Sequence, residues 1–233
     1  MHKMNLLQLL KDNAEKPRNW SVKAAGDEAT VYVYDVIGGL FGGVDAEQMT
    51  RDLSEIEAKT INLRINSPGG DVFEARAIAT ALKEHPAEVV AHVDGLAASA
   101  ATTIAMAADR VEISDGGFFM IHNAWTLAIG NKSDMLDSAA LLEKVDQAIA
   151  SDYMNKTGAD AEQVKQWMDD ETWFTAQEAV EHGFADSVKE DKAKAKNWNL
   201  AAYSNAPEIK DESSGPDRAE LERRLTLLES CAA

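Results

Sequence analysis

The alternation of strand-type and helix-type segments is the feature that most constrains how this chain folds. Residues 30–37 (TVYVYDVI), 60–66 (TINLRIN) and 88–93 are rich in β-branched and apolar side chains, as strands are. Residues 45–58 and 71–85 lie between them and repeat apolar side chains at helical spacing. Repeated strand–helix–strand units predict a mainly parallel sheet covered by helices, which is the α/β class.

The second half of the chain continues this alternation. Residues 100–108 predict a buried helix of small side chains, and residues 110–113 and 118–121 predict two further strands. A long helix is predicted over residues 133–155. The side chains expected to face the core from this helix are Leu136, Ala140, Val145, Ile149 and Tyr153.

Composition excludes several classes of protein. The 233 residues include 23 Lys and Arg against 40 Asp and Glu, so the formal net charge is -17. Such a charge repels phosphate backbones, and we expect no nucleic-acid partner. No run of about 18 apolar residues is present, so no membrane span is expected. The apolar stretch at residues 6–10 is too short for the core of a signal peptide. The single cysteine, Cys231, allows no internal disulfide, and together these features predict a cytoplasmic protein.

Changes in composition along the sequence divide the chain into three parts. A short arm is expected at residues 1–29, one folded domain at residues 30–188, and a charged tail at residues 189–233. Within the tail, residues 189–215 are turn-rich and predict a mobile linker, and residues 216–229 predict a short terminal helix.

Two strand-to-helix junctions have residue types that suit catalysis. Residues 66–71 (NSPGGD) place two glycines where backbone N–H groups are free to bind an oxyanion, although a plain turn would explain them too. In residues 94–101 (DGLAASAA), Ser99 is surrounded by small side chains that leave its hydroxyl open to a substrate. The alternative for Ser99 is a helix N-cap.

A histidine and an acidic group complete the set of candidates. His122 follows an apolar strand, at a position where sites collect in α/β sheets, although a histidine at the rim of the core is the plainer explanation. Residues 169–171 (DDE) could supply a carboxylate that orients an imidazole, or they could be a solvated acidic loop. The five histidines lack the spacing of metal ligands, so no metal site is predicted. Together the candidates supply a nucleophile, a base, an acid and backbone donors.

Four segments then carry a family resemblance: NSPGG at residues 66–70, GLAAS at 95–99, MIH at 120–122 and TAQEAVEHGFAD at 175–186. In order and spacing they resemble the proteolytic subunit of the Clp protease, of the S14 serine peptidases. The likeness is greatest to the ClpP-related head maturation (prohead) proteases of tailed phages and prophages. Those proteases commonly carry an IGG, an INSPGGDV and an ETW, which stand here at residues 37–39, 65–72 and 171–173.

The resemblance implies a ClpP/crotonase-type fold and a serine endopeptidase that works through an acyl-enzyme. Ser99 would be the nucleophile and His122 the general base, while the backbone N–H groups of Gly70 and Ala100 would form the oxyanion hole. No cofactor is implied.

The third member of the implied triad departs from the family pattern. Alignment without gaps places Glu171 where the family has aspartate, and Asp170 or Asp169 would take the role if the loop were shifted. Glutamate is one methylene longer, and Ser-His-Glu triads are chemically workable.

The resemblance also implies partners. We expect a homo-oligomeric ring, a heptamer or a double heptamer, that interlocks through the long helix. The substrates would be proteins or peptides, and the likeness to head maturation proteases implies capsid and scaffold proteins inside a prohead. The axial loops that engage an ATP-dependent unfoldase are not recognisable in residues 1–29, so such a partner is uncertain. Two alternatives stay open: an inactive ClpP-like assembly protein, and a crotonase-class acyl-CoA enzyme.

Overall fold

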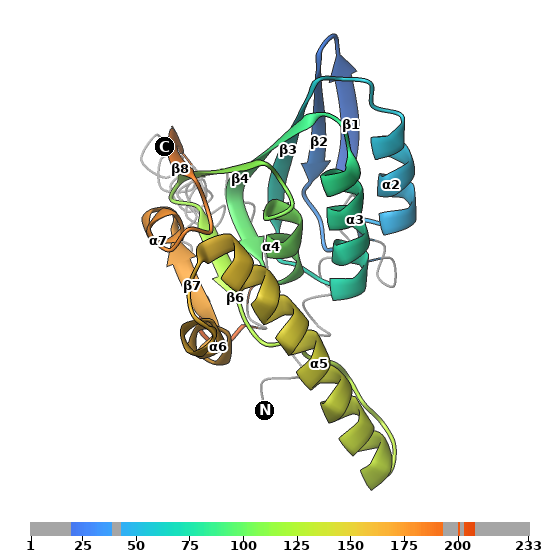
Figure 1. The fold of residues 1–233 in the computed structure, drawn as a ribbon, viewed down its shortest axis with the longest axis vertical. Helices are drawn as coiled ribbons and strands as arrows, with labels where there is room; N and C mark the ends of the chain where they lie inside the picture. The colour runs from blue at the N-terminus through green and yellow to red at the C-terminus, as the bar shows by residue number, and fades with distance from the viewer. Residues whose placement is uncertain (1–19, 39–42, 193–199, 201–202, 208–233) are drawn as a thin grey trace, which may run out of the picture.

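The described part of the chain folds around one eight-stranded sheet, shown as a ribbon in Figure 1. The structure, a computed structural model, describes residues 20–38, 43–192, 200 and 203–207. The predicted helix at residues 216–229 and the first 19 residues of the predicted arm lie outside the described residues. The strands are β1 (Trp20–Ala25), β2 (Glu28–Val33), β3 (Thr60–Ser67), β4 (Glu88–Ala98), β5 (Arg110–Asp115), β6 (Phe118–Ile121), β7 (Thr172–Thr175) and β8 (Ser187–Lys192).

The sheet is mainly parallel, which confirms the fold class expected from the alternation. Strands β2, β3, β4, β5 and β8 are neighbours in that order and run parallel, while β1 is antiparallel to β2. On the side away from β3, the long strand β4 has two partners along its length, because Val90 to Val93 pair with β5 and Leu96 to Ala98 pair with β6. Strand β7 is antiparallel to β6. The end of β4 therefore lies beside the end of β6.

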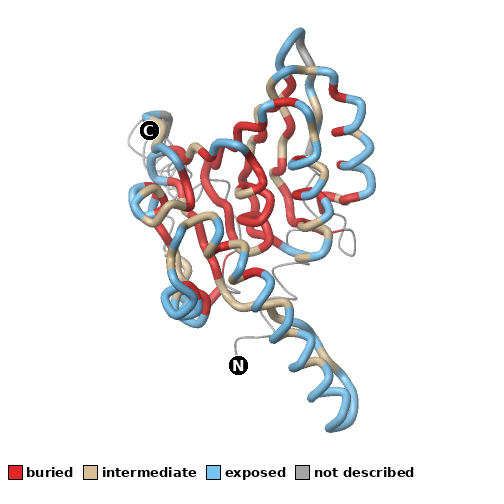
Figure 2. The backbone as a smooth tube through the Cα atoms, in the orientation of Figure 1, coloured by how far each residue is buried: buried red, intermediate tan, exposed pale blue. Residues whose placement is uncertain are grey.

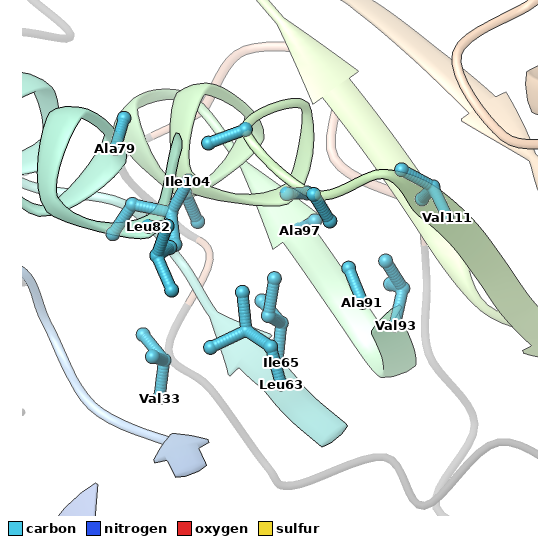
Figure 3. Packing of buried hydrophobic residues seen from close by; sticks show 14 of the residues in the cluster. Val33, Leu63, Ile65, Ala79, Leu82, Ala91, Val93, Ala97, Ile104 and Val111 are labelled. Carbon is cyan, nitrogen blue, oxygen red and sulfur yellow. The ribbon is translucent and has the colours of Figure 1, made fainter. Parts of the chain in front are cut away.

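Helices cover one face of this sheet and supply the core. Side chains alternate between buried and partly exposed along β2 and along most of β3, as expected for strands with one face against a core. Figure 3 shows Leu82 and Ile104 of the covering helices packed over Leu63 and Ile65 of β3. All four are at most 2% exposed, and burying each such side chain contributes about 1.5–3 kcal/mol.

The helices begin where the sequence supplies capping side chains. The Asp71 carboxylate accepts hydrogen bonds from the backbone N–H groups of Phe73 and Glu74, and Thr175 and Glu178 form the reciprocal capping box that their spacing predicts. The helices are α2 (Ala46–Ser54), α3 (Val72–Glu84), α4 (Ala100–Ala105), α5 (Lys132–Thr157), α6 (Ala161–Asp169) and α7 (Ala176–Glu181). Within residues 20–38 and 43–192, no helix has the length and apolar character needed to cross a bilayer.

The long helix α5 differs from its prediction in its first half. Ile149 and Tyr153 are buried as expected, and Val145 packs against the core. Leu136 is 60% exposed and Ala140 is exposed, so the prediction that they face the core is wrong. The reason is that the first turns of α5 project beyond the sheet, as Figures 1 and 2 show, while only its last turns lie against the body of the domain.

The sheet also extends past the predicted domain limits at both ends. Strand β1 lies within the predicted arm, where it forms a hairpin with β2 through Gly26 at a φ of 64°. Strand β8 reaches Lys192 within the predicted linker and pairs with β5. Its sequence SVKEDK is polar because an edge strand has few apolar neighbours, and such a strand carries little apolar signal.

Candidate active site

Ser99 stands at a sharp turn between β4 and α4. Its φ of 53° and ψ of -126° are unusual for a residue with a side chain. The backbone is held there by two hydrogen bonds, because Ser99 N–H donates to the Met120 carbonyl at 2.9 Å and Thr102 N–H donates to the Ser99 carbonyl at 2.9 Å. Ser99 occupies the N-cap position of α4, as the alternative expected, but its side chain makes no capping bond, so the hydroxyl is available to another partner.

That partner is His122. The pairing of Ala98 with Met120 brings the ends of β4 and β6 together, and Nε2 of His122 lies 2.7 Å from Oγ of Ser99. Burial lowers the pKa of His122 to about 4, while the charge of Glu171 acts in the opposite direction. The imidazole is therefore neutral at pH 7, which is the form that accepts a proton from a hydroxyl.

The three acidic candidates differ in what they contact. Asp169 accepts from Asn123 Nδ2 at 2.8 Å and pairs with Lys165, and Asp170 accepts from Gln166 at 2.6 Å. The carboxylates of Asp169 and Asp170 thus bond to side chains of α6, and Asp169 also bonds to the residue after His122. Glu171 is the one of the three whose charge acts on His122.

The contact between Glu171 and His122 is electrostatic. Among the described residues no hydrogen bond joins them, and the Glu171 carboxylate instead accepts from Trp173 Nε1 at 3.4 Å and from the backbone N–H of Asn205 at 2.8 Å. Glu171 has a φ of 49°, so its backbone is fixed in a rarely used conformation. The structure thus favours Glu171 over Asp170 and Asp169 as the orienting acid.

The glycine turn lies directly against the serine turn. A Cβ on Gly69 would lie 2.6 Å from the Ala98 carbonyl oxygen and 3.1 Å from the Ala100 nitrogen, so only glycine fits this approach. The turn is fixed from its other side, because Ile37 N–H donates to Gly69 O at 2.9 Å and Asp71 N–H donates to Ile37 O at 2.8 Å. Gly70 and Ala100, the two expected oxyanion donors, both line the cleft at Ser99.

This cleft has a volume of about 750 Å³ and is mostly apolar away from the reacting groups. Its reactive end is formed by Ser99 and His122 with the glycine turn, and α5 supplies much of its apolar wall. Such a cleft suits an extended peptide with apolar side chains, placed so that one carbonyl carbon lies at Ser99 Oγ. The side chains of α5 that line it are Leu141, Leu142, Val145, Ile149 and Tyr153.

Comparison with known proteins identifies the family. Residues 44–192 match the Clp protease family. The chain belongs to this family. The match confirms the resemblance found in the sequence at the level of the family, and with it the predicted enzyme class, a serine-type peptidase.

Individual relatives agree with this assignment. The chain is 30% identical over 139 residues to the ATP-dependent Clp protease proteolytic subunit 1 of Leifsonia xyli subsp. xyli, covering 59% of this chain and 71% of the relative. It is 30% identical over 180 residues to proteolytic subunit 3 of Rhodococcus jostii, covering 73% and 86%. A solved structure of a ClpP1 mutant from Listeria monocytogenes superposes with a TM-score of 0.62 at 24% identity, covering 70% and 91%, which shows the shared fold.

Two residues at this Clp-type site were missed by the sequence analysis. Tyr203 lines the cleft and Asn205 bonds to Glu171, yet both fall in the segment predicted to be a mobile linker. That prediction is wrong at residues 203–207, because Tyr203 and Leu200 bury apolar surface against β4 and β6. The available signal was a lone tyrosine close to a leucine within a charged and polar stretch.

Proposed function

We propose that the chain is a serine endopeptidase that hydrolyses peptide bonds through an acyl-enzyme. Ser99 is the nucleophile, His122 the general base, Glu171 the third member of the triad, and Gly70 and Ala100 the oxyanion donors. The observation that carries the proposal is the 2.7 Å contact between Ser99 Oγ and His122 Nε2 beside the glycine turn. This contact has the geometry of an activated nucleophile.

The reaction follows from these positions. As Ser99 Oγ attacks a peptide carbonyl carbon, its proton passes to Nε2 of His122. The carbonyl oxygen becomes an oxyanion that the N–H groups of Gly70 and Ala100 stabilise, each contributing about 3–4 kcal/mol. His122 then gives the proton to the leaving amine, and an ester to Ser99 remains. A water molecule, deprotonated by His122, hydrolyses this ester and restores the hydroxyl.

Glu171 acts while His122 carries the proton. A nearby carboxylate lowers the energy of an imidazolium ion, and the charge of Glu171 favours the protonated form of His122. The glycine turn, the serine turn and the loop before β7 come from distant parts of the chain, and the sheet holds all three in one place.

Covalent labelling tests this proposal. A fluorophosphonate probe is expected to modify the wild-type protein at Ser99 and to leave Ser99→Ala unlabelled, with peptide cleavage lost in parallel. Ser138→Ala is the matched control, because it removes a hydroxyl that bonds only along the surface of α5. A wild-type protein that assembles but neither labels nor cleaves would support the inactive assembly protein instead. Binding of acyl-CoA without labelling would support the crotonase-class enzyme.

We further propose that the chain forms a homo-oligomeric ring, a heptamer or a double heptamer. The projecting part of the molecule supports this, since several large apolar side chains there are more than a third exposed. Native mass spectrometry is expected to show rings, and Leu136→Asp is expected to break them. A wild-type protein that remains monomeric at micromolar concentration would contradict the proposal. The exposed side chains are Leu127, Ile129, Met135, Leu136 and Leu141.

For the substrate we propose capsid and scaffold proteins, with cleavage in the cytoplasm or inside a prohead. The support is the sequence resemblance of residues 37–39, 65–72 and 171–173 to head maturation proteases. A portal gene upstream and a capsid gene downstream of the coding sequence would agree with this role. The direct test is co-expression of the chain with the capsid and scaffold proteins. The wild-type chain is expected to cleave them, and Ser99→Ala is expected to leave them intact.

A further inference from the structure

A short segment far along the chain returns to the active site. After β8 ends at Lys192, the structure next describes Leu200 and residues 203–207. Leu200 and Tyr203 pack with Leu96, Ala98 and Met120 in a second apolar cluster, separate from the main core. This cluster lies at the ends of β4 and β6, the two strands that deliver the nucleophile and the base.

Tyr203 is held in three directions. Its hydroxyl donates to the Pro68 carbonyl at 2.5 Å, and its ring lies edge-to-face with His122 at 5.6 Å between centroids and with Trp173 at 5.6 Å. The residue is only 9% exposed. A clamped aromatic ring against the imidazole restricts how His122 turns and keeps water from that side of it.

Asn205 acts on the acid. Its backbone N–H donates to Oε1 of Glu171 at 2.8 Å, and its side-chain Nδ2 donates to the Asp170 carbonyl at 2.7 Å. The two bonds tie the segment both to the carboxylate and to the backbone beside it. Glu171 has a longer side chain than aspartate, so fixing its carboxylate removes rotamers that would point it away from His122.

We infer that Tyr203 and Asn205 complete the peptidase site, with Tyr203 positioning and shielding His122 and Asn205 positioning Glu171. The inference rests on the proposed function and adds two positioning residues to it. The segment is a wall of the cleft and not a plug, because the cleft keeps a volume of about 750 Å³ at Ser99 with Tyr203 among its lining residues.

The surroundings of His122 determine the pH at which activity is lost. The groups that face His122 are the Ser99 hydroxyl from the turn after β4, the Glu171 carboxylate from the loop before β7, and the Tyr203 phenol from the tail segment. Burial lowers the pKa of His122 to about 4. Because kcat/KM requires neutral imidazole, activity is present above this pKa and is lost as the pH falls through it.

The experiment measures the rate of Ser99 labelling by a fluorophosphonate, and kcat/KM per titrated site, from about pH 3 upward in the 233-residue chain. Tyr203→Ala admits water to His122, so the acidic limb of the pH profile, where activity falls as His122 is protonated, is expected to move up by about one pH unit or more. At pH 7, kcat/KM is expected to fall about 10- to 100-fold. Tyr203→Phe keeps the ring and is expected to keep the limb, with a smaller loss in kcat. Asn205→Ala keeps the backbone N–H that bonds Glu171 and removes the Nδ2 bond to the Asp170 carbonyl, so it loosens the segment beside Glu171 and is expected to lower kcat with KM unchanged.

Ser204→Ala is the matched control, since Ser204 is an exposed neighbour within the same segment. If Tyr203→Ala folds poorly, Tyr203→Leu keeps apolar cover and is expected to show a limb between those of wild type and Tyr203→Ala. A purely structural role would lower the number of titrated sites without moving the limb. An unmoved limb, or activity above wild type, would overturn the inference. Absence of labelling in the wild type would instead overturn the proposed function.

Discussion

Replacing Gly69 with alanine tests the close approach of the two turns. At a φ of 92°, an alanine costs about 1–2 kcal/mol in backbone energy alone. Its Cβ would also lie 2.6 Å from the Ala98 carbonyl oxygen and 2.8 Å from the Ser99 Cβ, so one of the turns must move. Movement of Ala100 N–H away from the oxyanion is expected to lower kcat by about 10²- to 10³-fold, as for loss of one oxyanion donor.

Gly158→Ala separates the steric effect from the backbone effect. Gly158 follows α5 at a φ of 73°, and a Cβ there would meet no atom within 4 Å. This control is expected to lose about 1 kcal/mol in the free energy of unfolding and to keep its kcat. Urea denaturation and single-turnover cleavage of a fluorogenic peptide measure the two quantities. If Gly69→Ala lost no more kcat than Gly158→Ala, the proposed oxyanion hole would be in the wrong place.

Three further predictions concern the acid, the base and the wall of the cleft. Glu171→Gln is expected to lower kcat by between about 10²- and 10⁴-fold, while the kcat of Asp169→Asn stays near the wild-type value. A larger loss of kcat in Asp169→Asn than in Glu171→Gln would make Asp169 the third member of the triad. Burial lowers the pKa of His122 to about 4, so the wild-type kcat/KM is expected to remain level from pH 8 to about pH 5 and to fall at lower pH as His122 becomes protonated. A midpoint near pH 6.5, the ordinary pKa of histidine, would contradict the burial argument. Tyr153→Phe removes a buried 2.8 Å hydrogen bond to Thr102 Oγ1 and is expected to cost about 1–2 kcal/mol in urea denaturation; an unchanged midpoint would show that this bond contributes nothing.

The parts of the fold that sequence predicted well depend on local pattern. Strand β3 and helix α3 were placed within two residues at each end, because β-branched alternation, the NSPGGD turn and Pro86 all lie within or beside them. The sequence also marks Ser99 and His122 as candidates, since small or apolar neighbours surround each of them. Their meeting at 2.7 Å, however, depends on the pairing of β4 with β6, which no local pattern specifies.

The parts that were predicted wrongly depend on long-range contacts. Leu136 carries the apolar signal of a core residue, but periodicity does not say which turns of a helix lie against the body of the domain. Strand β8 and Tyr203 lie in polar sequence, and their burial comes from edges and surfaces formed by residues much earlier in the chain. Choosing among three consecutive acids required side-chain directions, which spacing alone does not provide.

The order of the site along the chain has a consequence for biosynthesis. The ribosome delivers the serine and the histidine well before Tyr203 and Asn205, so a growing chain carries the nucleophile and base before it carries the residues that shield and orient them. A product of premature termination before Tyr203 would carry the nucleophile and the base and would lack those groups. In the proposed scheme, the site therefore becomes complete only after Tyr203 and Asn205 have been synthesised.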